Sequence, residues 1–166
     1  MNLKIKSWYF LILILAIVLV TGFFILKKEV HYHAGFQVYI DDELQDFSDL
    51  KYMQIEPCGE DEHVQVTENH EQIEKAHLHD GVSDVVHVHR DSAVWGDLFT
   101  NIGFPIDSGS HTYVNGNLVE DFLNRPIQPY ESLVILSGEN SEINEKLKNA
   151  VTREHIEVAE AKSESC

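Results

Sequence analysis

Six of the ten histidines in this chain stand in three His-x-His pairs. The pairs are His31 with His33, His77 with His79, and His87 with His89. On a β-strand, residues i and i+2 share a face, so each pair would place two imidazoles side by side. The residue between the two histidines is apolar in every pair, as expected for a strand whose other face is buried. The spacing therefore predicts imidazole pairs on strand surfaces.

Clustered imidazoles are ligands for transition metals. Imidazole-only ligation suits Zn²⁺, Cu²⁺ or Ni²⁺ and disfavours Ca²⁺ and Mg²⁺, which prefer oxygen. Three or four imidazoles fill one site, so six predict either two sites or one site with satellites. We predict a Zn or Cu site built from the paired histidines, with Asp80, His63 and His111 as weaker candidates. The acidic residues 60–62 could accept hydrogen bonds from ligands, and His155 is expected to be an exposed tail residue.

The second and third pairs lie on segments that resemble a hairpin. Strands at Ile73–His79 and Val85–Arg90 are expected, joined by a turn. A register with His79 opposite His87 places all four imidazoles on one face, whereas a slip of one residue would send the pairs to opposite faces. His31 and His33 would join this cluster if the first strand lies beside the hairpin.

Two other functions remain open at this stage. In a metalloenzyme, three imidazoles would hold zinc-hydroxide for hydration or hydrolysis, with Asp80 or Glu74 as the base. The surplus of ligands favours capture or delivery instead, because a catalytic zinc keeps three ligands and one open position. The third alternative is an interaction module or pH sensor, in which the histidines form a polar face that titrates.

A long apolar run near the start of the chain indicates a membrane anchor. Trp8–Leu26 comprises nineteen uncharged residues, which as a helix would span about 28 Å of the bilayer. Lysines flank the run on both sides, and no cleavage site of the A-x-A type follows it. We expect a single-pass anchor in the lipid bilayer, with the C-terminal body outside the cytoplasm.

Charge and cysteine content exclude several classes. Residues 29–166 contain 28 acidic and 8 basic side chains, a net charge of −20 with neutral histidines, which disfavours nucleic-acid binding. The two cysteines, Cys58 and Cys166, form no CxxC motif, which excludes a thiolate zinc ribbon and a thioredoxin-like pair. They are disulfide candidates for an oxidising compartment, with a thiolate ligand role as the alternative.

The body reads as a mixture of strands and one well-defined helix. Alternation over Val30–Ile40 predicts a half-buried strand, followed by a return strand at Leu44–Phe47. Trp95, Leu98, Phe99 and Ile102 recur at helical spacing, which predicts a core-facing helix ended by Gly103. A hairpin about Asn115-Gly116, an apolar strand Glu131–Leu136 and a charged surface helix that frays toward Cys166 complete the pattern.

The order of hairpin, helix, hairpin and last strand resembles a β-grasp (ubiquitin-like) domain. The opening hairpin 36–47, the helix 92–103, and the segments 113–119 and 129–136 carry the resemblance. It implies an α+β fold, with a β-grasp-like domain at 29–138 that is interrupted by an inserted β-hairpin at 48–90. The apolar run places the anchor at 1–28 before this domain, and the charged segment places the tail at 139–166 after it. No Gly-Gly terminus follows Leu136, so sulfur-carrier chemistry is not implied. The whole pattern of anchor, histidine pairs and tryptophan helix is also similar to an uncharacterised group of His-rich, membrane-anchored proteins from uncultured microbes.

Overall fold

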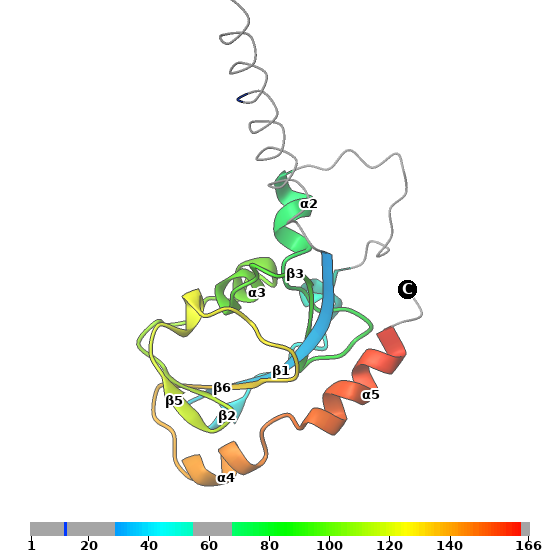
Figure 1. The fold of residues 1–166 in the computed structure, drawn as a ribbon. Helices are drawn as coiled ribbons and strands as arrows, with labels where there is room; N and C mark the ends of the chain where they lie inside the picture. Colours follow the sequence, from blue (N-terminus) through cyan, green and yellow to red (C-terminus); the bar gives the residue numbers. More distant parts are fainter. Residues whose placement is uncertain (1–11, 13–28, 55–67, 164–166) are drawn as a thin grey trace, which may run out of the picture.

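The computed structural model describes residues 12, 29–54 and 68–163, and this part of the chain is an α+β fold with one six-stranded sheet (Figure 1). The strands are β1 (Glu29–Ile40), β2 (Glu43–Leu44), β3 (Val85–Arg90), β4 (His111–Val114), β5 (Asn117–Val119) and β6 (Ser132–Ser137). The helices described are α2 (Glu68–Ile73), α3 (Trp95–Asn101), α4 (Ile143–Lys148) and α5 (Arg153–Ser163), with short 3₁₀ helices η1 (Leu50–Tyr52) and η2 (Phe122–Asn124).

Strand β1 is the centre of the sheet because it pairs with three other strands. Its second half runs parallel to β6, from Gly35 beside Ser132 onwards. Its other edge pairs antiparallel with β3 along the first half and with β2 at the end. Strands β4 and β5 continue the sheet beyond β6, which gives the order β2-β1-β6-β4-β5. The predicted first strand and the predicted buried last strand are both confirmed.

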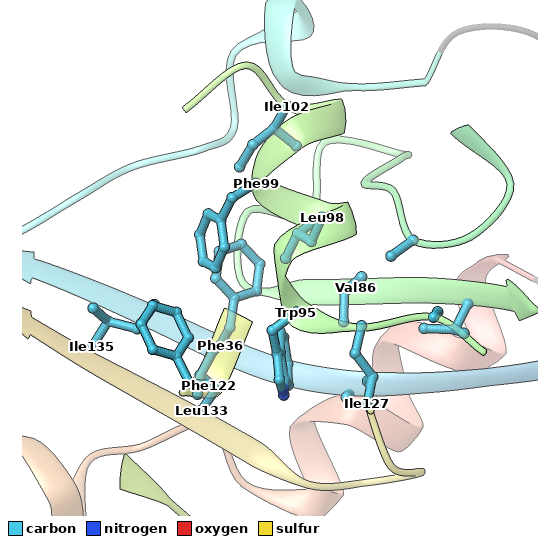
Figure 2. Packing of buried hydrophobic residues seen from close by; sticks show 14 of the residues in the cluster. Phe36, Val86, Trp95, Leu98, Phe99, Ile102, Phe122, Ile127, Leu133 and Ile135 are labelled. Atoms are coloured by element: carbon cyan, nitrogen blue, oxygen red, sulfur yellow. The ribbon is translucent and has the colours of Figure 1, made fainter. Parts of the chain in front are cut away.

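The main core lies between the sheet and α3 (Figure 2). Trp95 and Leu98 of α3 are fully buried, and Phe36 of β1 packs 6.5 Å from Trp95 and 6.1 Å from Phe99, measured between ring centroids. The helical stripe predicted from the sequence is therefore confirmed as core. Gly103 follows the helix with a φ of +63°, as a terminating glycine should.

Two tight turns set the hairpins. Asp41 and Asp42 both have positive φ, at 49° and 71°, and Asn115 and Gly116 have 50° and 77°, the pattern of type I′ turns. The Asn-Gly hairpin is as predicted. The predicted return strand Leu44–Phe47 extends too far. Strand β2 ends at Leu44, and Phe47 is buried against Phe36 instead.

The inserted segment is not the hairpin that the sequence predicts. Its first expected strand, Ile73–His79, is replaced by the end of α2 and an irregular stretch with two isolated bridges, from His77 to His87 and from Leu78 to Met53. The physical reason is the side chain of Asn101, whose amide donates to the carbonyls of Gln72 and Ala76 at 2.9 and 2.7 Å. These carbonyls are thereby paired at the end of α2 rather than with a neighbouring strand.

The C-terminal helix α5 covers the sheet on the face opposite α3 (Figure 1). Ile156 is fully buried there, and Val151 packs so closely on β1 that a Cβ at Gly35 would lie 2.5 Å from it. The prediction of a helical tail is confirmed, and α5 is docked through an apolar contact with Val85 of β3. The predicted fraying toward Cys166 lies outside the described residues.

The predicted anchor, Trp8–Leu26, lies outside the described residues apart from Ile12. Among the residues that the structure does describe, none of the helices has the length and apolar character needed to cross a membrane.

Candidate metal centre

The fold brings all six paired histidines to one place. His33 of β1 is opposite His87 of β3, and His77 exchanges two backbone hydrogen bonds with His87, at 3.0 and 2.9 Å. Strand β3 therefore lies between β1 and the segment 77–79. The intervening apolar residues Leu78 and Val88 are fully buried in the core, so the histidines point to the other face of the sheet.

His87 is the hub of the cluster. Its ring centroid lies 4.4 Å from those of His31, His33, His79 and His89, and 5.2 Å from that of His77. Such spacing places ring nitrogens of neighbouring strands within reach of a shared ion.

The pairing register differs from the predicted one by two residues. His87 pairs with His77, whereas the sequence predicted His79 opposite His87, because the connecting turn includes Asp80 and Gly81, both with positive φ. A two-residue slip keeps every side chain on its face. The predicted clustering of the histidines on one face is therefore found although the predicted partners are wrong.

Burial keeps the central histidines neutral. His33, His77 and His87 are 2–5% exposed. Burial is the main cause that lowers the pKa of His33 and of His77 from 6.5 to about 4. Glu160 opposes this lowering at His33, and the Ile73 carbonyl opposes it at His77. The pKa of His87 is lowered further by burial and by the neighbouring imidazoles. Neutral imidazole is the form that binds metal, so the site is ready for a cation at neutral pH.

Oxygen acceptors fix which nitrogen of two histidines carries the proton. Nδ1 of His77 lies 3.1 Å from the carbonyl of Ile73, which can only accept, so His77 donates through Nδ1. Nδ1 of His79 lies 2.5 Å from the Asp80 carboxylate, so the lone pair of both rings is on Nε2. Nδ1 of His33 lies 3.6 Å from a carboxylate oxygen of Glu160, an electrostatic contact longer than a hydrogen bond.

The remaining nitrogens converge on one another. Nε2 of His79 makes a close contact with Nδ1 of His87. Nε2 of His77 and Nε2 of His87 are buried and have no hydrogen-bond partner within the described part of the chain. Ligand atoms lie within 4.8 Å of one another in two triads, His31, His33 and His87, and His77, His87 and His89. The arrangement can coordinate a cation with nitrogen ligands alone.

Glu160 and Tyr130 are site residues that the sequence analysis missed. Glu160 lies on α5 beside His33, and the hydroxyl of Tyr130 donates to its other carboxylate oxygen at 2.8 Å. The available signal was helical spacing, because Glu160 follows the buried Ile156 by four residues and so shares its face.

The weaker candidates are distributed over the molecule. Asp80 contacts His79, as expected of an outer acceptor. His111 is exposed on β4, which β6 separates from β1. His155 is exposed on α5, with Nε2 3.0 Å from Asp84. The remaining candidates, His63, Cys58, Cys166 and residues 60–62, lie outside the described residues.

Comparisons with known proteins returned no family model, no curated protein and no solved structure that matches the chain. The assignment of the site therefore rests on its donor atoms and their geometry.

Proposed function

We propose that this protein binds a transition-metal ion, Zn²⁺ or Cu²⁺, through its histidine pairs, and that it captures or delivers the ion. The observation that carries the proposal is the orientation of His77 and His79. Each has an oxygen acceptor at Nδ1, which leaves the Nε2 lone pair for a ligand bond. Metal-ligating histidines characteristically donate their other ring N–H to a carboxylate or a carbonyl.

The donor set and the charge of the body favour a soft or borderline divalent cation. The two triads consist of imidazoles alone, which select Zn²⁺ or Cu²⁺ over Mg²⁺ and Ca²⁺. The net charge of −20 on residues 29–166 raises the local concentration of cations around the domain.

Capture or delivery is favoured over zinc-dependent hydrolysis. The two carboxylates considered as bases are already engaged, since Glu74 forms an ion pair with Arg90 and Asp80 contacts Nδ1 of His79. A catalytic zinc site needs a base within reach of bound water. The number of imidazoles also exceeds what one open catalytic site uses.

The proposed setting is a membrane-anchored, extracytoplasmic domain of β-grasp-like architecture. The β-grasp proposal is supported by the strand order β2-β1-β6-β4-β5, by the parallel pair β1 and β6, and by α3 between β3 and β4. The anchor is supported by the apolar run Trp8–Leu26 and its flanking lysines.

The test is metal binding by the full chain, purified in detergent and stripped with a chelator. Dialysis against Zn²⁺ or Cu²⁺, followed by elemental analysis, should give a chain that retains metal. The variant His77→Ala with His79→Ala should retain clearly less metal than the parent chain, because it removes two imidazoles from the buried part of the cluster.

The matched control is His111→Ala, which removes an exposed imidazole on the same sheet. It should keep the metal content of the parent chain. A parent chain that comes out of dialysis without metal would overturn the proposed function, and so would a His77→Ala, His79→Ala variant that binds as well as the control.

A further inference from the structure

The two candidate triads have one residue in common. His87 belongs to both, with His31 and His33 on the β1 side and with His77 and His89 in the other group. Strand β3 lies between β1 and the segment 77–79, so the His87 ring has imidazoles on both of its sides. A single histidine between two ligand groups is the arrangement that a shared ligand requires.

The two nitrogens of His87 have different surroundings. Nδ1 meets Nε2 of His79, which carries a lone pair because Nδ1 of His79 is engaged by Asp80. Nε2 of His87 is buried and has no hydrogen-bond partner among the described residues. A neutral His87 can donate its Nδ1–H to the lone pair of His79, and it then carries its own lone pair on the buried Nε2.

We propose that the cluster holds two divalent metal ions bridged by His87, one bound with His31 and His33 and the other with His77 and His89. This inference rests on the proposed function and specifies its stoichiometry. His87 uses one nitrogen for each ion, so its single N–H proton is displaced when the second ion binds and is released to solvent. The bond from nitrogen to that proton is replaced by a bond from nitrogen to metal, with no change of oxidation state.

The two positions differ in their access to solvent. The first triad contains His31, which is exposed, whereas the second contains the buried His77 and the half-buried His89. The ion bound with His31 and His33 should therefore exchange faster than its neighbour. A protein that passes metal to a partner would do so from this position.

The experiment counts ions and then asks whether they are coupled. The stripped full chain in detergent is loaded with Zn²⁺ for elemental analysis and with Cu²⁺ for electron paramagnetic resonance. We expect two ions per chain, and fewer detectable copper spins than copper atoms, because two Cu²⁺ ions on one imidazolate couple antiferromagnetically. The spin count needs no variant, so it stands even if a substitution prevents folding.

Variants then separate the two positions. His31→Ala with His33→Ala should leave one ion with its full copper signal, and His77→Ala with His89→Ala should likewise leave one. His87→Ala should weaken both ions, while His155→Ala, an exposed histidine of α5, should leave the count at two.

Each outcome bears on one proposal or the other. One ion per chain that is lost in either double variant would overturn the two-ion inference and leave metal binding intact. Two ions that keep their full signal and survive His87→Ala would overturn the shared ligand. A parent chain without metal would overturn the proposed function itself.

Discussion

The buried imidazoles of the cluster are held in defined orientations by groups outside it. The Ile73 carbonyl, the Asp80 carboxylate and the Glu160 carboxylate each face the Nδ1 of one histidine. The contacts of Ile73 and Asp80 select the tautomers of His77 and His79, and all three contacts reduce the rotamer freedom that a ligand would otherwise lose on binding metal. The affinity of the proposed site should therefore depend on residues that never touch the ion.

Glu160→Gln should weaken metal binding about 10-fold, because the amide loses the charge that stabilises the His33 ring as a ligand. Competition with a chelating dye measures the change in affinity. The control is Glu157→Gln on the same helix, which removes only an exposed ion pair with Arg153 and should leave the affinity unchanged. Equal affinities in the two variants would exclude a role for Glu160 at the site.

The metal-free protein should lose stability as the pH falls from about 6.5 to about 4. His33 and His77 have a pKa of about 4 in the fold against 6.5 ordinarily, so the unfolded chain binds protons first in this window. The free energy of unfolding then decreases by up to about 1.4 kcal/mol per pH unit for each histidine, and the decrease ends below their folded pKa.

Urea unfolding of the stripped chain at several pH values between about 7 and 5 measures this slope. Other titratable groups face the two histidines. Glu160 opposes the lowering of the His33 pKa, whereas His31, His79 and His89 each lower the pKa of His33, of His77 or of both. His33→Gln with His77→Gln should flatten the profile. A profile as steep in this variant as in the parent would assign the acid sensitivity to other groups.

At the scale of elements, two segments far apart in sequence frame the site. Strand β1 supplies His31 and His33 near its start, and α5, over a hundred residues later, supplies Glu160. The attachment of α5 is apolar and involves Val151, Ile156 and Ala159 against Val85. The tail is thus a structural part of the candidate site.

Ile156→Ala should destabilise the protein by about 2 to 5 kcal/mol, because it leaves a cavity beneath a fully buried side chain. Val158→Ala on the same helix is the control and should change stability by less than about 0.5 kcal/mol, since Val158 is 53% exposed. Chemical denaturation of the full chain in detergent compares them. Similar losses in both variants would mean that α5 is not docked through Ile156.

The elements that could be predicted are those whose pattern is local. Alternation defined β1, helical spacing defined α3, and Asn115-Gly116 defined a hairpin. The expected strand at Ile73–His79 failed because Asn101, distant in sequence, pairs the carbonyls at the end of α2. The position of α5 was also beyond prediction, since three apolar residues in a charged tail do not reveal which surface they cover.

The candidate site was predictable to the same degree. The alternation was sufficient to place the four imidazoles of the second and third pairs on one face, whereas the approach of His31 and His33 depended on β1 lying beside β3, which the structure shows. The partner of each histidine was not predictable, because it depends on the turn at Asp80 and Gly81. The position of Glu160 beside His33 depends on the docking of α5 and therefore could not be predicted either.

At the scale of the whole molecule, the candidate site connects segments that separate from one another when the chain unfolds. Its ligands come from β1, from β3 and from the segment 77–79, and α5 lies against them. A cation bound there interacts with the folded state far better than with the unfolded chain, so binding and folding are linked.

Addition of Zn²⁺ at about 100 times its dissociation constant should therefore raise the free energy of unfolding by about 2.7 kcal/mol for each independent ion. Thermal melting of the stripped chain before and after Zn²⁺ addition measures the gain, and chelator should reverse it. In the His77→Ala, His79→Ala variant the shift should be clearly smaller than in the parent chain. A melting temperature that does not respond to Zn²⁺ would contradict the link between metal and fold.

The proposed anchor predicts that the chain remains with membranes through alkaline carbonate extraction, as a spanning helix does. Deletion of residues 1–28 should release the domain into the supernatant. For orientation, protease added to intact cells should digest the domain, because it is expected outside the cytoplasm. Full protection of the domain, with digestion only after lysis, would place it on the other side.

Strand β1 begins at Glu29 and bears its first histidine two residues later. The apolar run ends at Leu26, so only five residue steps, at most about 18 Å of extended chain, separate the proposed bilayer segment from His31. A tether of that length gives the domain very little reach. The exposed side of the cluster would operate within a thin layer at the membrane surface, where it could exchange ions with a neighbouring membrane protein but not with a soluble carrier that stays in the bulk.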